Sequence, residues 1–213
     1  MGAKTGTVEF VELTSTSNGP VAAGFSASHR FVDLSAKPQP KAALNETWDV
    51  AAYPAGKGEA PYHVFDLTST QTCATDQPLI LPKYHYGGLG FRGNRQWDGK
   101  GNCEFLTSEG KTRADGNETR GRWVCMYGQV DGKTAGVAIL SHPDNFRSPQ
   151  PLRLHPSEPF ACFAPQQLGD FKIEPGQPYT TRYRIVTLDG PPDKALIDRL
   201  WHDYATPPDV KLK

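Results

Sequence analysis

The chain has 213 residues, in which 23 lysine and arginine residues balance 23 aspartate and glutamate residues, so its formal net charge is zero. A neutral chain lacks the basic surface that nucleic-acid binding requires, and we therefore predict no nucleic-acid partner. Hydrophobic residues make up 37% and charged residues 22% of the chain, which is typical of a folded globular protein. No apolar run approaches the roughly 18 residues that cross a bilayer, so we predict a soluble chain without a membrane span.

Alternating apolar and polar residues indicate a protein built mainly of β-strands. From Val21 to Phe31 the odd positions are apolar or histidine, while the even positions are mostly small or polar; this pattern is typical of a strand with one buried face. The 21 glycines and 19 prolines supply turns between such segments. Asp131-Gly132, between two of them, predicts a β-hairpin. The predicted strands are 7–13, 21–31, 44–52, 62–71, 78–86, 122–130, 135–141, 151–155, 160–163 and 179–188.

One helix is predicted, over residues 193–204 near the C-terminus. Its apolar residues repeat at helical spacing and form a single stripe. Pro191 and Pro192 precede it, as is common at a helix start. Many strands, one helix and no evident linker predict a mostly β protein, with one antiparallel β-sandwich domain over residues 1–213 and the helix against a sheet. The stripe consists of Leu196, Ile197, Leu200, Trp201 and Tyr204.

The longest weakly patterned stretch, 87–121, is rich in glycine, arginine, aspartate and asparagine. A long irregular polar segment in a compact β domain is often functional. It contains a G-x-G-x-x-G motif at 88–93, but a dinucleotide site needs a strand before this motif and a helix after it. Residues 94–99 do not start a helix. We therefore predict no nucleotide cofactor, and the sequence indicates no other cofactor.

A candidate ligand platform leads into this stretch. Tyr84, His85 and Tyr86 end a predicted strand, and a glycine-rich turn carries the chain on to Arg92. Glycine lets backbone approach a ligand, aromatic rings offer flat surfaces, and His85 and Arg92 supply hydrogen bonds. The combination suits a polar ring such as a sugar. The alternative is a tight strand–turn–strand junction with tyrosine at its rim.

Charged residues crowd the segment 104–122. Arginine and carboxylate at this density commonly form a structural ion-pair network. The functional alternative is recognition of a hydroxyl-rich or carboxylate ligand by arginine. Glu104 is our acid/base candidate, because the apolar Phe105 and Leu106 beside it would raise its pKa. The ligand-binding candidates in this segment are Lys111, Arg113, Asp115 and Arg122.

Two histidine-bearing turns follow, at 141–147 and 154–158. A polar cluster just past a buried strand is a good place for a site, and the alternative is a capping and turn cluster. A metal site would form if His85 and both turn histidines converged with a glutamate. The candidates here are His142 as acid or base, and Asn145, Arg147, His155 and Glu158 as ligand contacts.

Trp97 lies in the polar stretch and is a candidate stacking platform for a ring. The four cysteines form no C-x-x-C pair, which excludes a zinc ribbon. Cys125 and Cys162 lie in apolar strand-like runs, which favours buried free thiols, and one disulfide is the alternative. The cysteines are Cys73, Cys103, Cys125 and Cys162.

Five blocks of sequence resemble the PmoA-like family of bacterial proteins. They are GNCEFLTSEGKTRADGN at 101–117, AILSHPDNFR at 138–147, PQPLRLHPSEP at 149–159, DGPPD at 189–193 and LWHDY at 200–204. The resemblance implies a β-sandwich similar to the galactose mutarotase-like supersandwich, and a carbohydrate-associated role. Members of that family are longer at the N-terminus. The chain then corresponds to the C-terminal portion of such a protein or to a short form, and is exported if the full-length protein carries a signal peptide.

Three hypotheses of function follow. The first is a sugar-active enzyme of mutarotase, epimerase, lyase or hydrolase type, in which His85, Glu104 and His142 exchange protons and the other candidates hold a carbohydrate. The second is a non-catalytic glycan-binding or structural β-sandwich, and the third is a metal-dependent oxidoreductase. Titratable candidates that face each other across a pocket would favour the enzyme; scattered candidates would favour binding. The sequence leaves the oligomeric state open.

Overall fold

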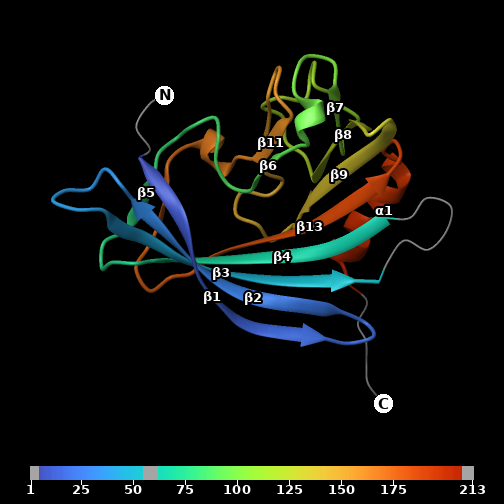
Figure 1. Ribbon diagram of the computed structural model, residues 1–213. Helices are drawn as coiled ribbons and strands as arrows, with labels where there is room; N and C mark the ends of the chain where they lie inside the picture. Colours follow the sequence, from blue (N-terminus) through green and yellow to red (C-terminus); the bar gives the residue numbers. More distant parts are fainter. Residues whose placement is uncertain (1–4, 55–61, 208–213) are drawn as a thin grey trace.

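The computed structural model describes residues 5–54 and 62–207. Eight strands form one antiparallel sheet, the main sheet, in the order β1-β2-β3-β4-β13-β9-β8-β7 (Figure 1). These strands are β1 (Gly6–Asn18), β2 (Ala23–Asp33), β3 (Lys41–Tyr53), β4 (Tyr62–Cys73), β7 (Cys103–Thr107), β8 (Trp123–Val130), β9 (Lys133–Ser141) and β13 (Tyr179–Asp189).

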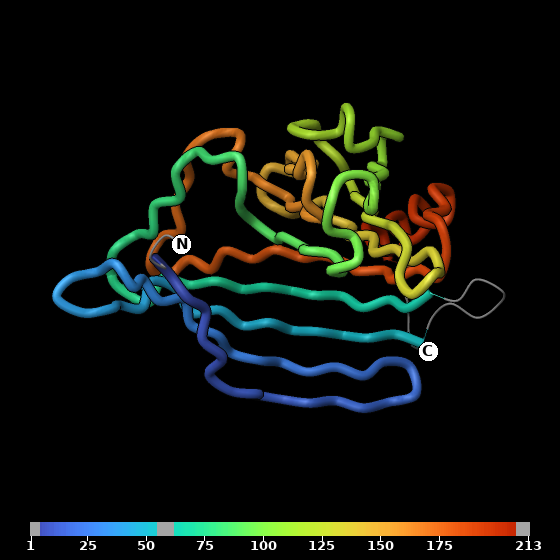
Figure 2. The backbone as a smooth tube through the Cα atoms, turned by 45° about the horizontal axis from the view of Figure 1, so that its top comes forward, coloured from blue at the N-terminus to red at the C-terminus, as the bar shows by residue number. Residues whose placement is uncertain are grey.

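Two small antiparallel sheets pack against part of the main sheet. One has the order β10-β11-β6, and the other pairs β12 with β5. In both views β6 and β11 lie near β8 and β9 and away from β1 (Figures 1 and 2). The predicted antiparallel β-sandwich is confirmed. The small strands are β5 (Leu79–Leu81), β6 (Gly90–Arg92), β10 (Leu152–Leu154), β11 (Phe160–Phe163) and β12 (Phe171–Ile173).

The main sheet is buried on both faces where the chain covers it. In β8, Val124 and Met126 pack into one core with Phe163 of the small sheet. The alternate residues Trp123 and Cys125 of the same strand pack into a second core, under the helix. Because side chains in a strand point alternately to opposite faces, a strand buried on both sides has no polar face.

The predicted C-terminal helix is present as α1 (Lys194–Ala205). The side chain of Asp193 caps its first turn by accepting hydrogen bonds from the backbone N–H groups of Ala195 and Leu196. Asp198 accepts a hydrogen bond from the indole N–H of Trp123 at 2.9 Å, which ties the helix to the main sheet. In the described ranges, no helix combines the length and apolar character needed to cross a bilayer.

The outer half of the main sheet has little cover. Strand β1 is an edge strand, and Val8, Phe10 and Leu13 on it are 53%, 65% and 54% exposed. Strand β2, predicted to bury one face, leaves Phe25 40% exposed. The alternation predicted these strands correctly, but burial depends on whether another layer lies above them.

The stretch 87–121, predicted to be irregular, contains two strands and a 3₁₀ helix. They are β6, β7 and η1 (Arg95–Trp97). Strand β12 was also missed, and residues 84–86, predicted as strand, form a loop after β5. Strands of three to five residues carry too few alternations to stand out, and their pairing with distant strands stabilises them.

The Asp131-Gly132 hairpin is confirmed, since it joins β8 to β9 and both residues have positive φ, at 50° and 77°. The prediction of free thiols is confirmed as well, and the disulfide alternative is wrong, because all four cysteines are free. Burial raises the pKa of Cys103 and Cys162 to about 11 and that of Cys125 to about 12, so these thiols are unreactive at neutral pH.

Candidate functional site

The three predicted acid/base residues do not share a pocket. His85 lies in the loop before β6, Glu104 is exposed on edge strand β7, and His142 follows β9. In the described part of the chain, no hydrogen bond or ion pair joins any two of them. The prediction of one proton-exchange site built from these residues is wrong, because each residue belongs to a different part of the β-sandwich.

Two predicted ligand-binding arginines hold the backbone together instead. The Arg113 guanidinium donates to the carbonyls of His155, Glu158 (3.1 Å) and Cys103 (2.7 Å) and lies 4.3 Å over the Phe105 ring. The Arg147 guanidinium donates to three carbonyls of residues 165–170, at 2.7, 2.7 and 3.0 Å. The terminal nitrogens of both guanidinium groups already donate to backbone carbonyls, so the arginine-fork prediction is wrong at both positions.

Other candidates also have structural roles. Trp97 is only 3% exposed and its indole N–H donates to the Gln129 carbonyl, so it is a core residue rather than a stacking platform. The Asn145 amide joins the turn after β9 to β13, as the capping alternative predicted. Arg122 forms ion pairs with Glu109 and Asp198, as the ion-pair alternative predicted.

Lys111 and Asp115 belong to a single turn. The backbone N–H of Lys111 donates to the Thr107 hydroxyl, and the Asp115 carboxylate accepts hydrogen bonds from the backbone N–H and the hydroxyl of Thr112. The backbone hydrogen bond from Thr112 lowers the pKa of Asp115. This carboxylate therefore caps its own turn.

Several predicted residues do come together around an aromatic cluster, which consists of Tyr84, His85, Tyr86 and Phe160. The rings of Tyr84, His85 and Tyr86 follow one another with centroids 4.3 and 4.4 Å apart. Tyr86 meets Phe160 edge-on at 5.7 Å, and the Arg153 guanidinium lies 5.2 Å over the Tyr86 ring. The segment 84–86 is therefore an aromatic surface, as the ligand-platform hypothesis requires.

The second histidine turn lies beside this cluster. Arg92 pairs with Glu158 at 3.3 Å and lies 5.6 Å over Phe160. His155 Nδ1 accepts a hydrogen bond from the Glu158 backbone N–H at 2.9 Å, so the imidazole helps to form the turn. Burial lowers the pKa of His155. The Arg92–Glu158 pair leaves a balanced rather than a positive surface here.

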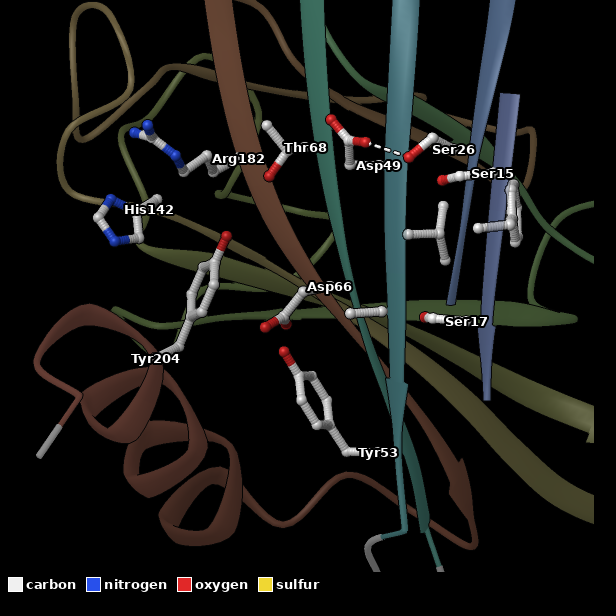
Figure 3. Close-up of a pocket in the computed structure, with 13 residues that line it drawn as sticks. Ser15, Ser17, Ser26, Asp49, Tyr53, Asp66, Thr68, His142, Arg182 and Tyr204 are labelled. Carbon is white, nitrogen blue, oxygen red and sulfur yellow. Dashed lines mark hydrogen bonds between the residues drawn. The ribbon is translucent and has the colours of Figure 1, made fainter. Parts of the chain in front are cut away.

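A polar groove of about 360 Å³ lies beside the C-terminal half of helix α1 and contains the predicted His142 (Figure 3). We call it the α1 groove. Its floor spans strands β1 to β4 and β13, and its residues were otherwise missed by the sequence analysis. The polar and aromatic residues that line it are Ser15, Ser17, Ser26, Asp49, Tyr53, Asp66, Thr68, His142, Arg182 and Tyr204.

Strand register builds the floor of the α1 groove in two rows. The first row is polar and crosses five strands. Within it, the Ser26 hydroxyl donates to Asp49 Oδ1 at 2.5 Å. The second row contains the small residue Ala51, which lines the groove and leaves its floor hollow. The first row, which we call the polar row, consists of Ser15, Ser26, Asp49, Thr68 and Arg182.

An ion pair and two phenols close one end of the α1 groove. Arg184 donates two hydrogen bonds to the Asp66 carboxylate, at 2.7 and 2.9 Å, and lies 4.7 Å over the Tyr204 ring. Burial raises the pKa of Tyr204, and burial followed by the charge of Asp66 raises that of Tyr53. Both phenols are therefore neutral hydrogen-bond donors at neutral pH.

His142 stands at the same end. Its Nδ1 accepts a hydrogen bond from the Asp144 backbone N–H at 3.2 Å. In the neutral imidazole the single N–H proton is therefore on Nε2. The imidazole meets the Tyr204 ring edge-on at 5.0 Å. Burial lowers the pKa of His142 more than the Asp144 carboxylate raises it, so the ring is neutral at neutral pH.

A signal for this groove was present in the sequence but incomplete. Asp66 and Thr68 occupy alternate positions of β4, opposite in phase to the buried Leu67. This alternation indicated a polar face. It did not indicate that residues from four further strands would line up beside them, because register is set by pairing across the sheet.

A family model described as a family of unknown function, DUF6807, matches residues 1–202. The chain belongs to the DUF6807 family. No curated protein and no solved structure matches the chain.

The third hypothesis required three metal-ligating side chains around one point. The described residues of this DUF6807 member contain no group of three or more histidine, cysteine, aspartate or glutamate side chains that could hold a metal ion. His142 and His155 lie in separate clusters, with Asp144 and with Glu158 respectively. The arrangement that would have favoured a metal-dependent oxidoreductase is therefore not formed by the candidate residues.

We expect the free energy of unfolding of this DUF6807 chain to decrease as the pH falls below about 6.5, partly because of His142. Its pKa is lowered in the folded state, so between the two pKa values the unfolded chain binds a proton that the folded chain does not. Urea unfolding at pH 7 and pH 5 measures the loss. His142→Gln should reduce the loss of unfolding free energy. The control His63→Gln, at an exposed residue of β4, should leave the loss unchanged. An equal loss in the wild type and in His142→Gln would contradict the assignment of this pH dependence to His142.

Proposed function

We propose that the chain binds an uncharged saccharide in the α1 groove. The observation that carries this proposal is the polar row, in which hydroxyls, a carboxylate and a guanidinium stand side by side across five strands. Sugar hydroxyls donate and accept hydrogen bonds, so they require both kinds of partner in close succession. Tyr53 and Tyr204 add aromatic surface for the apolar C–H face of a sugar ring.

The charges of the α1 groove support an uncharged ligand. Asp66 is neutralised by Arg184, with which it forms a two-point ion pair. Asp49 and Arg182 bear opposite charges at different places in the polar row, and neither forms an ion pair with a described residue. A charged ligand would therefore be attracted by one of these groups and repelled by the other. Opposite charges along the floor instead offer strong acceptors and donors to hydroxyl groups.

Binding without catalysis is the form of this proposal that the geometry supports best. The predicted proton-exchange residues are scattered, which is the arrangement that favours the glycan-binding hypothesis. The resemblance to the PmoA-like family, and through it to mutarotase-like sandwiches, points to the same class of ligand. Within the α1 groove, both oxygens of the Asp66 carboxylate accept hydrogen bonds from Arg184, so the carboxylate is engaged within the chain.

Acid/base catalysis on the bound sugar is a second candidate, and one observation favours it. His142 is neutral at neutral pH and has Nδ1 occupied by its own turn, so Nε2–H is the ring group left for a ligand. Tyr204, in contact with the imidazole, supplies a second proton donor. Ring opening of a sugar, as in mutarotation, needs a donor to the ring oxygen and an acceptor for the proton of the anomeric hydroxyl; this donor pair would supply the first, and solvent water the second.

Titration calorimetry with a panel of neutral mono- and oligosaccharides tests the binding proposal. At least one should bind, and Asp49→Ala should weaken it about tenfold or more, because a charged acceptor is lost. Ala51→Phe should abolish binding by filling the hollow, while the matched control Asp76→Ala, in an exposed turn, should leave it unchanged. Absence of binding by every sugar would contradict the proposal. Polarimetry of mutarotation with and without His142→Gln then decides between binding and catalysis.

A further inference from the structure

A second cavity of about 280 Å³ lies at the aromatic cluster. It belongs to the small-sheet layer, whereas the α1 groove is on the helix side of the main sheet. We call this cavity the tyrosine cleft. The rings of Tyr84 and Tyr86, 5.9 Å apart, belong to its walls. The residues that line it are Leu81, Pro82, Tyr84, Tyr86, Gly87 and Gln166, and none of them carries a charge.

The amide of Gln166 is an unusual member of this lining. The residue is only 8% exposed, and Oε1 is buried without a hydrogen-bond partner in the described part of the chain. A buried acceptor with no partner costs free energy, and such atoms are rare in folded proteins. An acceptor beside a cavity can recover that free energy from a ligand that donates a hydrogen bond.

Gly87 makes room for this amide. A Cβ atom at position 87 would come within 2.2 Å of Gln166 Oε1, and the backbone there has a φ of 141°, which favours glycine. The backbone N–H of Tyr84 donates to the Gln166 carbonyl at 3.3 Å, which fixes the aromatic loop against the same residue. The acceptor and the tyrosine walls are therefore held in one arrangement.

The lining specifies the chemistry of a ligand. Apolar and aromatic walls favour an apolar group, and a bare hydroxyl-rich ring would leave most of its hydroxyls without partners. The buried, unpaired acceptor favours one N–H donor next to that apolar group. An acetamido group combines a methyl group with one amide N–H, and it is carried on a sugar ring that can stack on tyrosine.

We propose that the tyrosine cleft binds the acetamido group of an N-acetylated sugar, with its N–H donating to Gln166 Oε1 and its methyl group against the walls formed by Tyr84 and Tyr86. This site is separate from the α1 groove and does not depend on ligand binding there. It gives a role to the aromatic loop and to an unpaired buried acceptor that the α1 groove leaves unexplained.

Calorimetric titration of the full chain with N,N′-diacetylchitobiose, and with cellobiose as the matched disaccharide without acetamido groups, tests this inference. We expect diacetylchitobiose to bind about tenfold or more tightly than cellobiose at this site, since the site's acceptor would otherwise stay unpaired. Equal affinities, or no binding of diacetylchitobiose, would overturn it.

Three variants locate the site. Gln166→Leu removes the acceptor but keeps the volume, so it should lose the diacetylchitobiose preference while its melting temperature stays the same or rises. Tyr86→Leu should lose the preference as well, and it replaces Gln166→Leu as the test of the site if Gln166→Leu does not fold. Ala51→Phe, which fills the α1 groove, should retain it. Full binding by Gln166→Leu, or loss of binding in Ala51→Phe, would show that the acetamido sugar binds elsewhere.

Discussion

Replacing Arg113 by alanine is expected to lower the free energy of unfolding by about 3 kcal/mol or more, because three backbone carbonyls lose their donor. These carbonyls belong to Cys103 on β7 and to His155 and Glu158 in the turn before β11, so one guanidinium joins the edge of the main sheet to the small sheet. The aromatic contact with Phe105 is lost at the same time. For a chain of this size the melting temperature should fall by about 6 to 12 °C.

Thermal and urea unfolding of Arg113→Ala and Arg113→Lys measure this effect. Lysine should restore only a small part, because an ammonium group cannot reach three carbonyls in the planar geometry of a guanidinium. Arg95→Ala, on an exposed arginine of η1, is the matched control and should unfold like the wild type. A change below about 1 kcal/mol in Arg113→Ala would mean that water replaces the guanidinium at the three carbonyls, and would contradict this structural role.

Arg184→Leu is expected to destabilise the chain by about 3 kcal/mol and to abolish saccharide binding in the α1 groove. The Arg184 and Asp66 side chains are only 15% and 20% exposed, so loss of one partner leaves a largely buried charge. Arg184 also lies over the rings of Tyr53 and Tyr204, at 5.8 and 4.7 Å. Both tyrosines should therefore move when the guanidinium is removed.

A double-variant cycle separates the charge effect from packing. Arg184→Leu combined with Asp66→Val should be more stable than Arg184→Leu alone, because the unpaired carboxylate is then gone. Urea unfolding gives the four free energies, and calorimetry with the saccharide identified for the wild type gives the binding loss. If the double variant is as unstable as the sum of the single variants, the ion pair contributes no coupling and Arg184 acts only through its contacts with tyrosine.

The candidate site was only partly predictable from the sequence. The aromatic run at 84–86 and the two histidine turns were identified as functional candidates. The structure places the first of these turns at the α1 groove and the second beside the aromatic cluster. For the arginines of 104–122 the sequence left an ion-pair network and ligand recognition as alternatives; Arg122 forms ion pairs, whereas Arg113 donates to backbone carbonyls, which neither alternative predicted. Arginine has many donors, and the sequence does not show whether backbone carbonyls or a ligand will occupy them.

The sequence by itself determined the class of the fold, ten strand segments, the Asp131-Gly132 hairpin and the C-terminal helix. These features depend on local alternation, helical spacing and turn residues, which are properties of neighbouring positions. Only the tertiary structure decided that Ser26, Asp49, Thr68 and Arg182 stand in one row, and that Gln166 meets Gly87 beside two tyrosines. Both arrangements arise from pairing and packing between residues far apart in the chain, and no local pattern encodes which strands become neighbours or in which register they pair.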